Sequence, residues 1–157
     1  MDTLDYASGG KGLLRVFNDH MNEDDARRRF ASARVARLAT ADSSAVPHLV
    51  PITFALDGDE VAFVVDHKPK RSTNLRRLRN IVQNPNVCLI VDEYDDDWAR
   101  LWWVRADGHA EIHESGQVRD RAVAKLMDRY EQYRETPPQG PAVLITVSAW
   151  TGWAYST

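Results

Sequence analysis

A short basic segment of the sequence has the residue types that bind an anion. Residues 68–74 (KPKRSTN) join the expected end of a strand to the expected start of a helix. The free N–H groups and the dipole at a helix N-terminus attract negative charge, and Ser72 and Thr73 add hydroxyl donors. Lys70 and Arg71 would add charge-assisted hydrogen bonds. The segment therefore predicts a phosphate site, and the alternative is a solvated basic loop that only caps the helix.

The basic residues are concentrated around this segment. The chain has 20 Lys and Arg residues against 23 Asp and Glu residues, for a net charge of −3. Such a balance gives no overall attraction to nucleic acid. The basic residues between positions 68 and 79 have no acidic residue among them: Lys68, Lys70, Arg71, Arg76, Arg77 and Arg79. A local basic patch on an otherwise acidic chain favours a small anionic ligand over a long polyanion.

Tryptophan is the second unusual feature of the sequence. The chain has five tryptophans: Trp98, Trp102, Trp103, Trp150 and Trp153. Trp102 and Trp103 are adjacent on an expected strand, so their side chains point to opposite faces of the sheet. One of the two is therefore expected to face a cleft or a partner subunit. Packing in the core or at an interface is the alternative for the set as a whole.

The sequence lacks the common catalytic and metal-binding motifs. His109 and His113 are too far apart on an expected strand to chelate one metal easily, and no other histidine has ligand spacing. Cys88 lies in an apolar strand and is expected to be a small buried hydrophobe. There is no Gly-rich phosphate loop, no GxSxG motif and no useful pair of carboxylates. If the protein is an enzyme, we expect a bound cofactor to supply the reaction chemistry.

Six strands and three helices are expected to position these residues. The apolar patterns predict strands at 35–40, 48–56, 61–66, 87–92, 101–113 and 142–149. The helices are expected to begin at an N-cap, which is Asn22 in the first, Ser72 or Thr73 in the second, and Ser115 in the third. They end near Arg34, at residues 84–86 and near Tyr133.

Three local signals refine this arrangement. The turn at Asp57 and Gly58 makes the flanking strands antiparallel neighbours. Pro51 cannot donate to a strand ladder, so it marks a sheet edge or a bulge. Gly108 is expected to bend the long strand. Strands joined mostly by hairpins, with helices inserted, predict a mainly β fold in which helices plug a small antiparallel barrel.

The whole chain, residues 1–157, is expected to be a single domain with a loose N-terminal arm at residues 1–20. No run of about 18 apolar residues is present, so no membrane span is expected. The N-terminal residues lack the pattern of a signal peptide, and there is one cysteine. We therefore expect a cytoplasmic protein without a membrane partner.

Several segments together carry a resemblance to a known superfamily. They are the strands ARLAT and HLVPITF, the run FVVDHKPKR leading into NLRRLRNIVQNPNVCLIVD, and DDDWARLWWVRADGHAEI. Over about residues 22–155 the chain resembles the pyridoxamine 5'-phosphate oxidase-like split β-barrel superfamily, in particular its deazaflavin (F420)-dependent oxidoreductase branch. The resemblance implies a six-stranded antiparallel split β-barrel of the FMN-binding type with flanking helices. It also implies a homodimer that binds coenzyme F420, or alternatively FMN, at the subunit interface.

The resemblance further implies which residues bind the cofactor. Carried over to this sequence, the contacts fall on Val50, Pro51, Ile52 and Thr53 along the tricyclic ring; on Val65 and Asp66 beside the ribityl chain; on Lys70, Arg71 and Asn74 at the phosphate; and on Trp98, Arg100 and Trp102 of the second subunit. No catalytic side chain and no metal ligand is assigned. The C-terminal TGWAYST has no Arg-His arrangement of the kind that would indicate pyridoxamine phosphate oxidation.

The leading hypothesis is an F420-dependent oxidoreductase that transfers a hydride between the deazaflavin and a conjugated small organic substrate. An FMN-binding oxidoreductase of the same fold, or a non-catalytic flavin or haem binder, is the alternative. Arg76, Arg77 and Arg79 are expected on one exposed helix face, where they would either meet the polyglutamate tail of F420 or be solvated. No nucleic-acid partner is expected.

Overall fold

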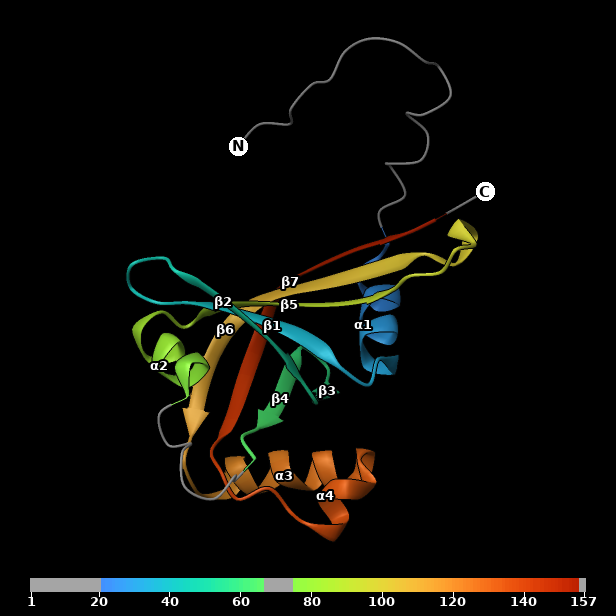
Figure 1. Ribbon diagram of the computed structural model, residues 1–157. Helices are drawn as coiled ribbons and strands as arrows, with labels where there is room; N and C mark the ends of the chain where they lie inside the picture. Colours follow the sequence, from blue (N-terminus) through green and yellow to red (C-terminus); the bar gives the residue numbers. More distant parts are fainter. Residues whose placement is uncertain (1–20, 67–74, 156–157) are drawn as a thin grey trace.

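The computed structural model describes residues 21–66 and 75–155. Its elements, in chain order, are α1 (Glu23–Ser32), β1 (Ala36–Ala41), β2 (Pro47–Ile52), β3 (Ala55–Asp57), β4 (Glu60–Val64), α2 (Arg76–Gln83), β5 (Asn86–Glu93), the 3-10 helix η1 (Trp98–Arg100), β6 (Trp102–His113), α3 (Gln117–Arg129), α4 (Glu131–Glu135) and β7 (Ala142–Ala154) (Figure 1).

The strands form one antiparallel sheet in the order β2-β1-β5-β6-β7-β4-β3. The expected mainly β class with flanking helices is confirmed. The described strands do not close into a barrel, because β2 and β3 remain at the two edges of the sheet. Pro51 lies in β2, so the predicted edge position of this proline is confirmed. The sheet has seven strands rather than the expected six.

The additional strand arises because the segment 48–56 is interrupted at Thr53 and Phe54. Phe54 is fully buried, with its ring centroid 4.9 Å from that of Phe30. The hydroxyl oxygen of Tyr130 lies 3.2 Å from the Phe54 backbone nitrogen and 3.0 Å from its carbonyl oxygen. A side chain from a later helix thus replaces the sheet partners of Phe54. Local alternation of apolar residues cannot reveal this long-range replacement.

Of the three predicted helix N-caps, the structure confirms one. Asn22 caps α1 as predicted, with its side chain accepting a hydrogen bond from the Asp25 backbone at 2.8 Å. Helix α2 has Leu75 at its N-cap position, so neither Ser72 nor Thr73, which lie outside the described residues, is its cap. Helix α3 starts after Gly116, whose φ of 93° favours glycine, rather than after Ser115. Among the described residues, no helix could span a membrane.

The expected third helix is two helices, since the chain leaves the helical path at Tyr130 and resumes it in α4. The break places the Tyr130 hydroxyl against the backbone of Phe54 and also 2.8 Å from the carbonyl of Arg34. The guanidinium of Arg129 lies over the Phe54 ring, 4.7 Å from its centroid. The break in the helix and the interruption of the strand therefore meet at one contact, between the Tyr130 hydroxyl and the backbone of Phe54.

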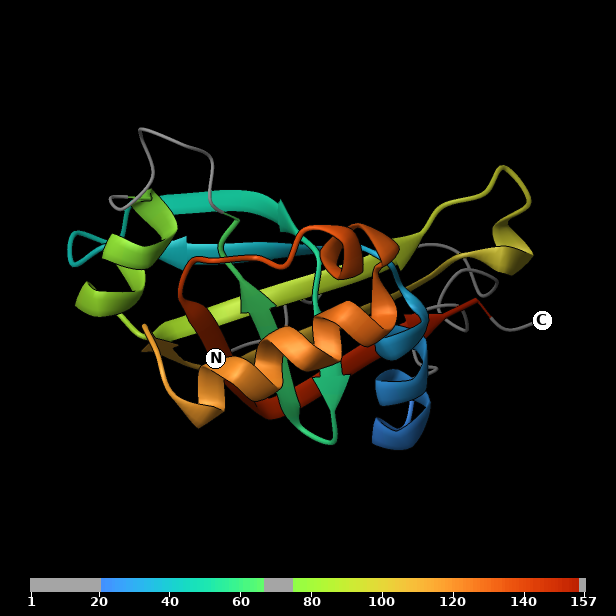
Figure 2. The ribbon, with the colours of Figure 1, turned by 90° about the horizontal axis from the view of Figure 1, so that it is seen from below.

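Two hydrophobic clusters pack against the sheet. The larger cluster contains Phe30 of α1, Leu78 and Ile81 of α2, and apolar residues of the strands. The smaller cluster lies between α3 and the strands β3, β4 and β7, which α3 crosses in Figure 2. Half of its buried members are alanines: Ala55, Ala62, Ala122 and Ala142.

Strands β6 and β7 form a long hairpin, paired from Trp102–Ala154 to His113–Ala142. The register shifts between Asp107 and Gly108, which confirms the predicted bend. A Cβ atom at Gly108 would lie 2.5 Å from the Thr146 carbonyl oxygen, so the close approach of β7 requires glycine there. Strand β7 continues to Ala154 instead of ending near residue 149, because it pairs with β6 over its whole length.

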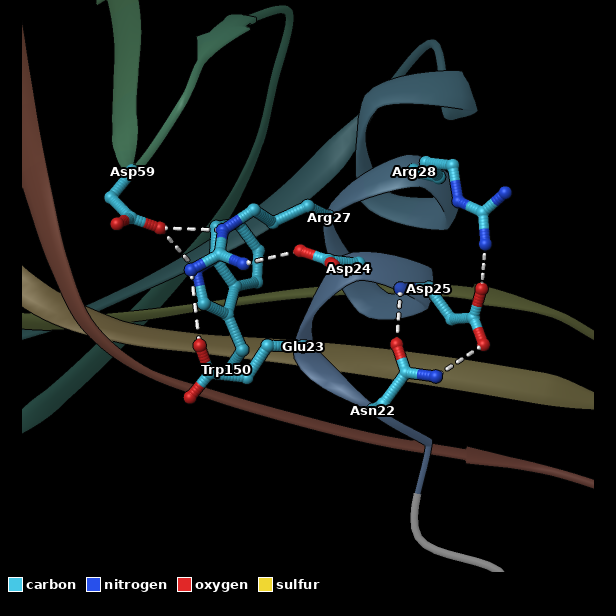
Figure 3. A network of polar contacts seen from close by, with 8 residues as sticks. All are labelled: Asn22, Glu23, Asp24, Asp25, Arg27, Arg28, Asp59 and Trp150. Carbon is cyan, nitrogen blue, oxygen red and sulfur yellow. Dashed lines mark hydrogen bonds and ion pairs between the residues drawn. The ribbon is translucent and has the colours of Figure 1, made fainter.

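Asp59, in the turn between β3 and β4, joins three parts of the fold (Figure 3). Its Oδ1 atom accepts hydrogen bonds from Arg27 Nε of α1 at 2.7 Å and from Trp150 Nε1 of β7 at 2.8 Å. The hydrogen bond from Arg27, followed by that from Trp150, lowers the pKa of the Asp59 carboxyl from its ordinary value of 3.8. The ionised carboxylate is thus favoured in the folded state.

Replacement of Tyr130 by Phe is expected to lower the free energy of unfolding by about 1–3 kcal/mol, because the buried N–H of Phe54 loses its partner. Chemical denaturation measures this change. Tyr94→Phe is the matched control, since Tyr94 is 70% exposed. An equal effect of the two substitutions would show that the Tyr130 hydroxyl does not stabilise the fold.

Asp59 is expected to make stability depend on acidic pH. Because its pKa is lower in the folded state, its contribution is full above pH 3.8 and is lost as the pH falls below that value. The Asp59→Asn variant should therefore lose less stability than the wild type when denaturation is followed from pH 5 downwards. The control is Asp96→Asn in the exposed β5–β6 loop. Parallel pH profiles for the wild type and Asp59→Asn would contradict the assignment.

Candidate functional site

A small cavity of about 130 Å³ lies where the ends of β2 and β4 meet α2 and α4. Its lining residues are Pro51, Ile52, Thr53, Phe63, Val64, Asp66, Arg77 and Tyr133. The cavity thus joins the interrupted strand, a cationic side chain of α2 and a phenol of α4. We call it the Arg77 pocket.

Arg77 is the most informative residue of this pocket. Its Nε atom is buried and has no hydrogen-bond partner among the described residues. Burial lowers the pKa of Arg77, but an arginine side chain remains protonated in proteins. A buried donor atom without a partner is costly, and an anion in the pocket would accept a hydrogen bond from this Nε atom. The structure therefore indicates an anion-binding position at Arg77.

The expectation that Arg77 shares an exposed face with Arg76 and Arg79 is wrong. Arg76 and Arg79 are exposed, whereas Arg77 is half-buried and lines the pocket. Residues four apart lie on the same side of a helix, so Arg77 is placed beside the buried Ile81. The two remaining exposed arginines form what we call the Arg76/Arg79 face.

Two hydroxyl groups stand opposite each other in the Arg77 pocket. Thr53 Oγ1 and Tyr133 Oη are 2.8 Å apart. Burial raises the pKa of the Tyr133 phenol, so it stays neutral and able to donate a hydrogen bond near pH 7. The ring of Tyr133 packs edge-on against Tyr130, with centroids 5.8 Å apart. The pocket therefore combines the Arg77 cation, the Asp66 carboxylate and two hydroxyls, so an anion would bind on the side of Arg77 and the hydroxyls, away from Asp66.

The structure brings part of the expected ring-binding strand to this pocket. Pro51, Ile52 and Thr53 line it, and so does Asp66. Val50 does not line the pocket; it packs against the larger hydrophobic cluster, to which Ile52, on the same face of the strand, also belongs. Val65 is buried, and its backbone pairs with the loop 140–141 at 3.0 Å in both directions.

The expected phosphate residues Lys70, Arg71 and Asn74 lie outside the described residues. The sequence did not indicate Tyr133 as a site residue, and Arg77 was expected on the exposed face of its helix. The spacing of Arg77 and Ile81 was a usable signal for the arginine. No local pattern indicates that Tyr133 faces Thr53, since the two residues are 80 positions apart.

The remaining expected contacts, Trp98, Arg100 and Trp102, do not line the Arg77 pocket. They lie at η1 and the start of β6, at the end of the molecule opposite α2 in Figure 1. Trp98 is 63% exposed. The guanidinium of Arg100 pairs with Asp95 at 3.1 Å, and the Trp102 indole donates to Glu93 at 2.9 Å. Their expected role in a second subunit remains a prediction.

A mainly apolar cavity of about 380 Å³ lies near these residues. Trp103 and Trp153 line it and are paired in register, so they share one face of the sheet. The neighbouring Trp102 also reaches this cavity, but it packs against the larger hydrophobic cluster and under Arg29. The prediction that one of the adjacent tryptophans faces a cleft is confirmed for Trp103.

Cys88 does not have the properties of a reactive thiol. It is half-buried rather than fully buried, and burial, followed by the nearby Asp107, raises its pKa to about 11. The thiol is therefore protonated near pH 7 and poorly nucleophilic. Within the described ranges, no group of three or more metal-ligating side chains comes together.

Several solved structures are similar to this chain. An FAD-binding protein from Mesorhizobium loti has a TM-score of 0.65 and 19% identity, over 85% of this chain and 94% of that chain. An FAD-binding protein from Mycobacterium smegmatis has a TM-score of 0.62 and 18% identity, over 88% and 99% of the two chains. A haem storage protein from Vibrio cholerae has a TM-score of 0.63 and 15% identity, over 84% and 91%. These similarities show a shared fold.

Sequence comparison gives the family directly. No match was found among curated proteins. The family model for pyridoxamine 5'-phosphate oxidase, by contrast, matches residues 23–154, which include all the helices and strands described above. The chain therefore belongs to the pyridoxamine 5'-phosphate oxidase family.

Proposed function

We propose that this protein is an F420-dependent oxidoreductase that transfers a hydride between the deazaflavin and a conjugated small organic substrate. The observation that carries the proposal is the buried, unpartnered Nε of Arg77 in a pocket at the end of the expected ring-binding strand. Both F420 and FMN contain a phosphate group, and the donors of the pocket fit such an anion. When bound, the deazaflavin supplies the hydride chemistry.

The residues of the chain would bind and orient this cofactor. Arg77 would neutralise phosphate charge, and the hydroxyls of Thr53 and Tyr133 would add hydrogen bonds that fix its position. Lys70 and Arg71 precede Arg77 by only a few positions and would add charge at the same phosphate. Pro51, at the edge of the sheet, leaves this stretch of β2 unpaired on its outer side. A tricyclic ring could lie along it.

The Arg76/Arg79 face supports F420 over FMN. FMN ends at its phosphate, whereas F420 continues into a tail with several carboxylates. Two exposed arginines that flank the half-buried Arg77 on the same helix would meet such a tail. FMN binding is the second candidate, because similar folds belong to proteins named as FAD-binding. A non-catalytic haem binder is the third, in view of the haem storage protein.

We further propose a homodimer that acts in the cytoplasm. The β5–β6 connection extends beyond the sheet and carries Asp95, Asp96 and Asp97 beside the exposed Trp98. Its negative charge is complementary to the Arg76/Arg79 face. Docking of this connection near α2 of a second subunit would bring Trp98, Arg100 and Trp102 to the cofactor. It would also cover apolar surface around Trp103.

Replacement of Arg77 by Gln is expected to weaken cofactor binding by about tenfold or more, because one charge-assisted hydrogen bond contributes about 1.5–3 kcal/mol. Fluorescence titration with F420 and with FMN measures the change. Arg28→Gln, on the exposed side of α1, is the matched control. The Lys70→Ala/Arg71→Ala double variant should lose on the order of 100-fold. Unchanged affinity in Arg77→Gln would place the phosphate elsewhere.

The Arg76/Arg79 face gives a separate test of cofactor identity. The Arg76→Gln/Arg79→Gln variant should weaken F420 binding modestly, more at low salt than at high salt, because each exposed ion pair contributes about 0–1 kcal/mol and is screened. The loss should grow with the number of glutamates in the tail. FMN affinity should hardly change. An unchanged affinity for F420 at low salt would show that these arginines do not contact the tail.

A further inference from the structure

A third cavity, of about 470 Å³, lies between α3 and the strands β3, β4 and β7. It shares no lining residue with the Arg77 pocket. Its volume is within the range of about 300–1,000 Å³ that is typical of small-molecule sites. The proposed function assigns no role to it.

The apolar part of this cavity, which we call its floor, is formed by four aliphatic side chains on two facing walls. Ala62 of β4 and Leu144 of β7 form one wall, and Val118 and Ala122 of α3 form the other. Ala62 and Ala122 are buried members of the smaller hydrophobic cluster, which is rich in alanine. Larger side chains at these positions would fill the space between helix and sheet. The alanines therefore leave room for an apolar group of a ligand.

The rim of the cavity carries two charges of each sign. Lys125 Nζ and Asp57 Oδ2 form an ion pair at 2.7 Å, and this hydrogen bond lowers the pKa of Asp57. Glu60 and Arg121 also line the cavity. Within residues 21–66 and 75–155 neither of them has an ion-pair or hydrogen-bond partner through its side chain, although Glu60 is half-buried. As far as the structure describes the chain, the half-buried Glu60 and the exposed Arg121 are thus left without a partner at the mouth of a cavity that has an apolar floor and a polar rim.

We propose that this cavity binds a small zwitterion with an apolar side chain, such as an aliphatic α-amino acid. The ammonium group would pair with Glu60, the carboxylate with the planar guanidinium of Arg121, and the side chain would contact the floor around Ala122. A simple anion would meet the uncompensated charge of Glu60, and a simple cation would meet that of Arg121. A ligand with both charges satisfies both residues.

L-Leucine is the probe for a titration of the full chain, followed by two-dimensional amide NMR. We expect saturable binding at millimolar concentration or below, with shifts among the residues of α3 and β4. The probe 4-methylpentanoate lacks the ammonium group that would pair with Glu60 and should bind about tenfold more weakly. The probe 3-methylbutylamine lacks the carboxylate that would pair with the exposed Arg121 and should bind up to about fivefold more weakly. Equal binding of the three probes would overturn the zwitterion assignment.

Three variants test the location of the site. Glu60→Gln should weaken leucine binding about tenfold, and Arg121→Gln, whose side chain is exposed, up to about fivefold, while Arg28→Gln should leave it unchanged. Ala122→Leu should fill the floor and abolish binding, with its folded state checked by the dispersion of the amide spectrum. Should Ala122→Leu unfold the protein, Arg121→Gln, which alters an exposed side chain, decides the matter. Absence of wild-type binding at about 10 mM leucine, or full affinity in Arg121→Gln, would overturn the proposal.

Discussion

The hydroxyl of Tyr130 occupies the position on which the arrangement of the site depends. A buried backbone amide must find a hydrogen-bond partner, and Phe54 lies where the chain has left the sheet. The Tyr130 oxygen supplies that partner and also contacts the carbonyl of Arg34. One side chain therefore joins the end of α3 to the interrupted strand and to the segment that leads from α1 into β1. Without it, the interruption would expose two polar groups to an apolar core.

This interruption creates the Arg77 pocket. Because β2 ends at Ile52, Thr53 lies outside the strand, where its hydroxyl meets that of Tyr133. Because the helix breaks at Tyr130, α4 can turn Tyr133 toward that position. Helix α2 then adds Arg77, whose buried Nε lacks a partner in the described part of the chain. A polar cavity at the edge of the larger hydrophobic cluster is the result, and it contains hydrogen-bond donors together with the carboxylate of Asp66.

Much of the fold could be predicted from local patterns, and the site only in part. The cap at Asn22, the edge position of Pro51 and the bend at Gly108 all follow from properties of single residues or short segments, and all are confirmed. The broken strand and the broken helix were missed because each depends on the other across more than 70 positions. The orientation of Arg77 was missed because a charged side chain was assumed to face the solvent, although Arg77 lies four residues before the buried Ile81 on the helix.

The most direct test of the central claim is a crystal structure of the protein bound to F420. We expect the cofactor phosphate to accept a hydrogen bond from Arg77 Nε at about 2.7–2.9 Å, with the hydroxyls of Thr53 and Tyr133 beside it. We also expect the ring to lie along the end of β2. A bound cofactor whose phosphate is remote from α2, with Arg77 Nε still unpartnered, would contradict the account.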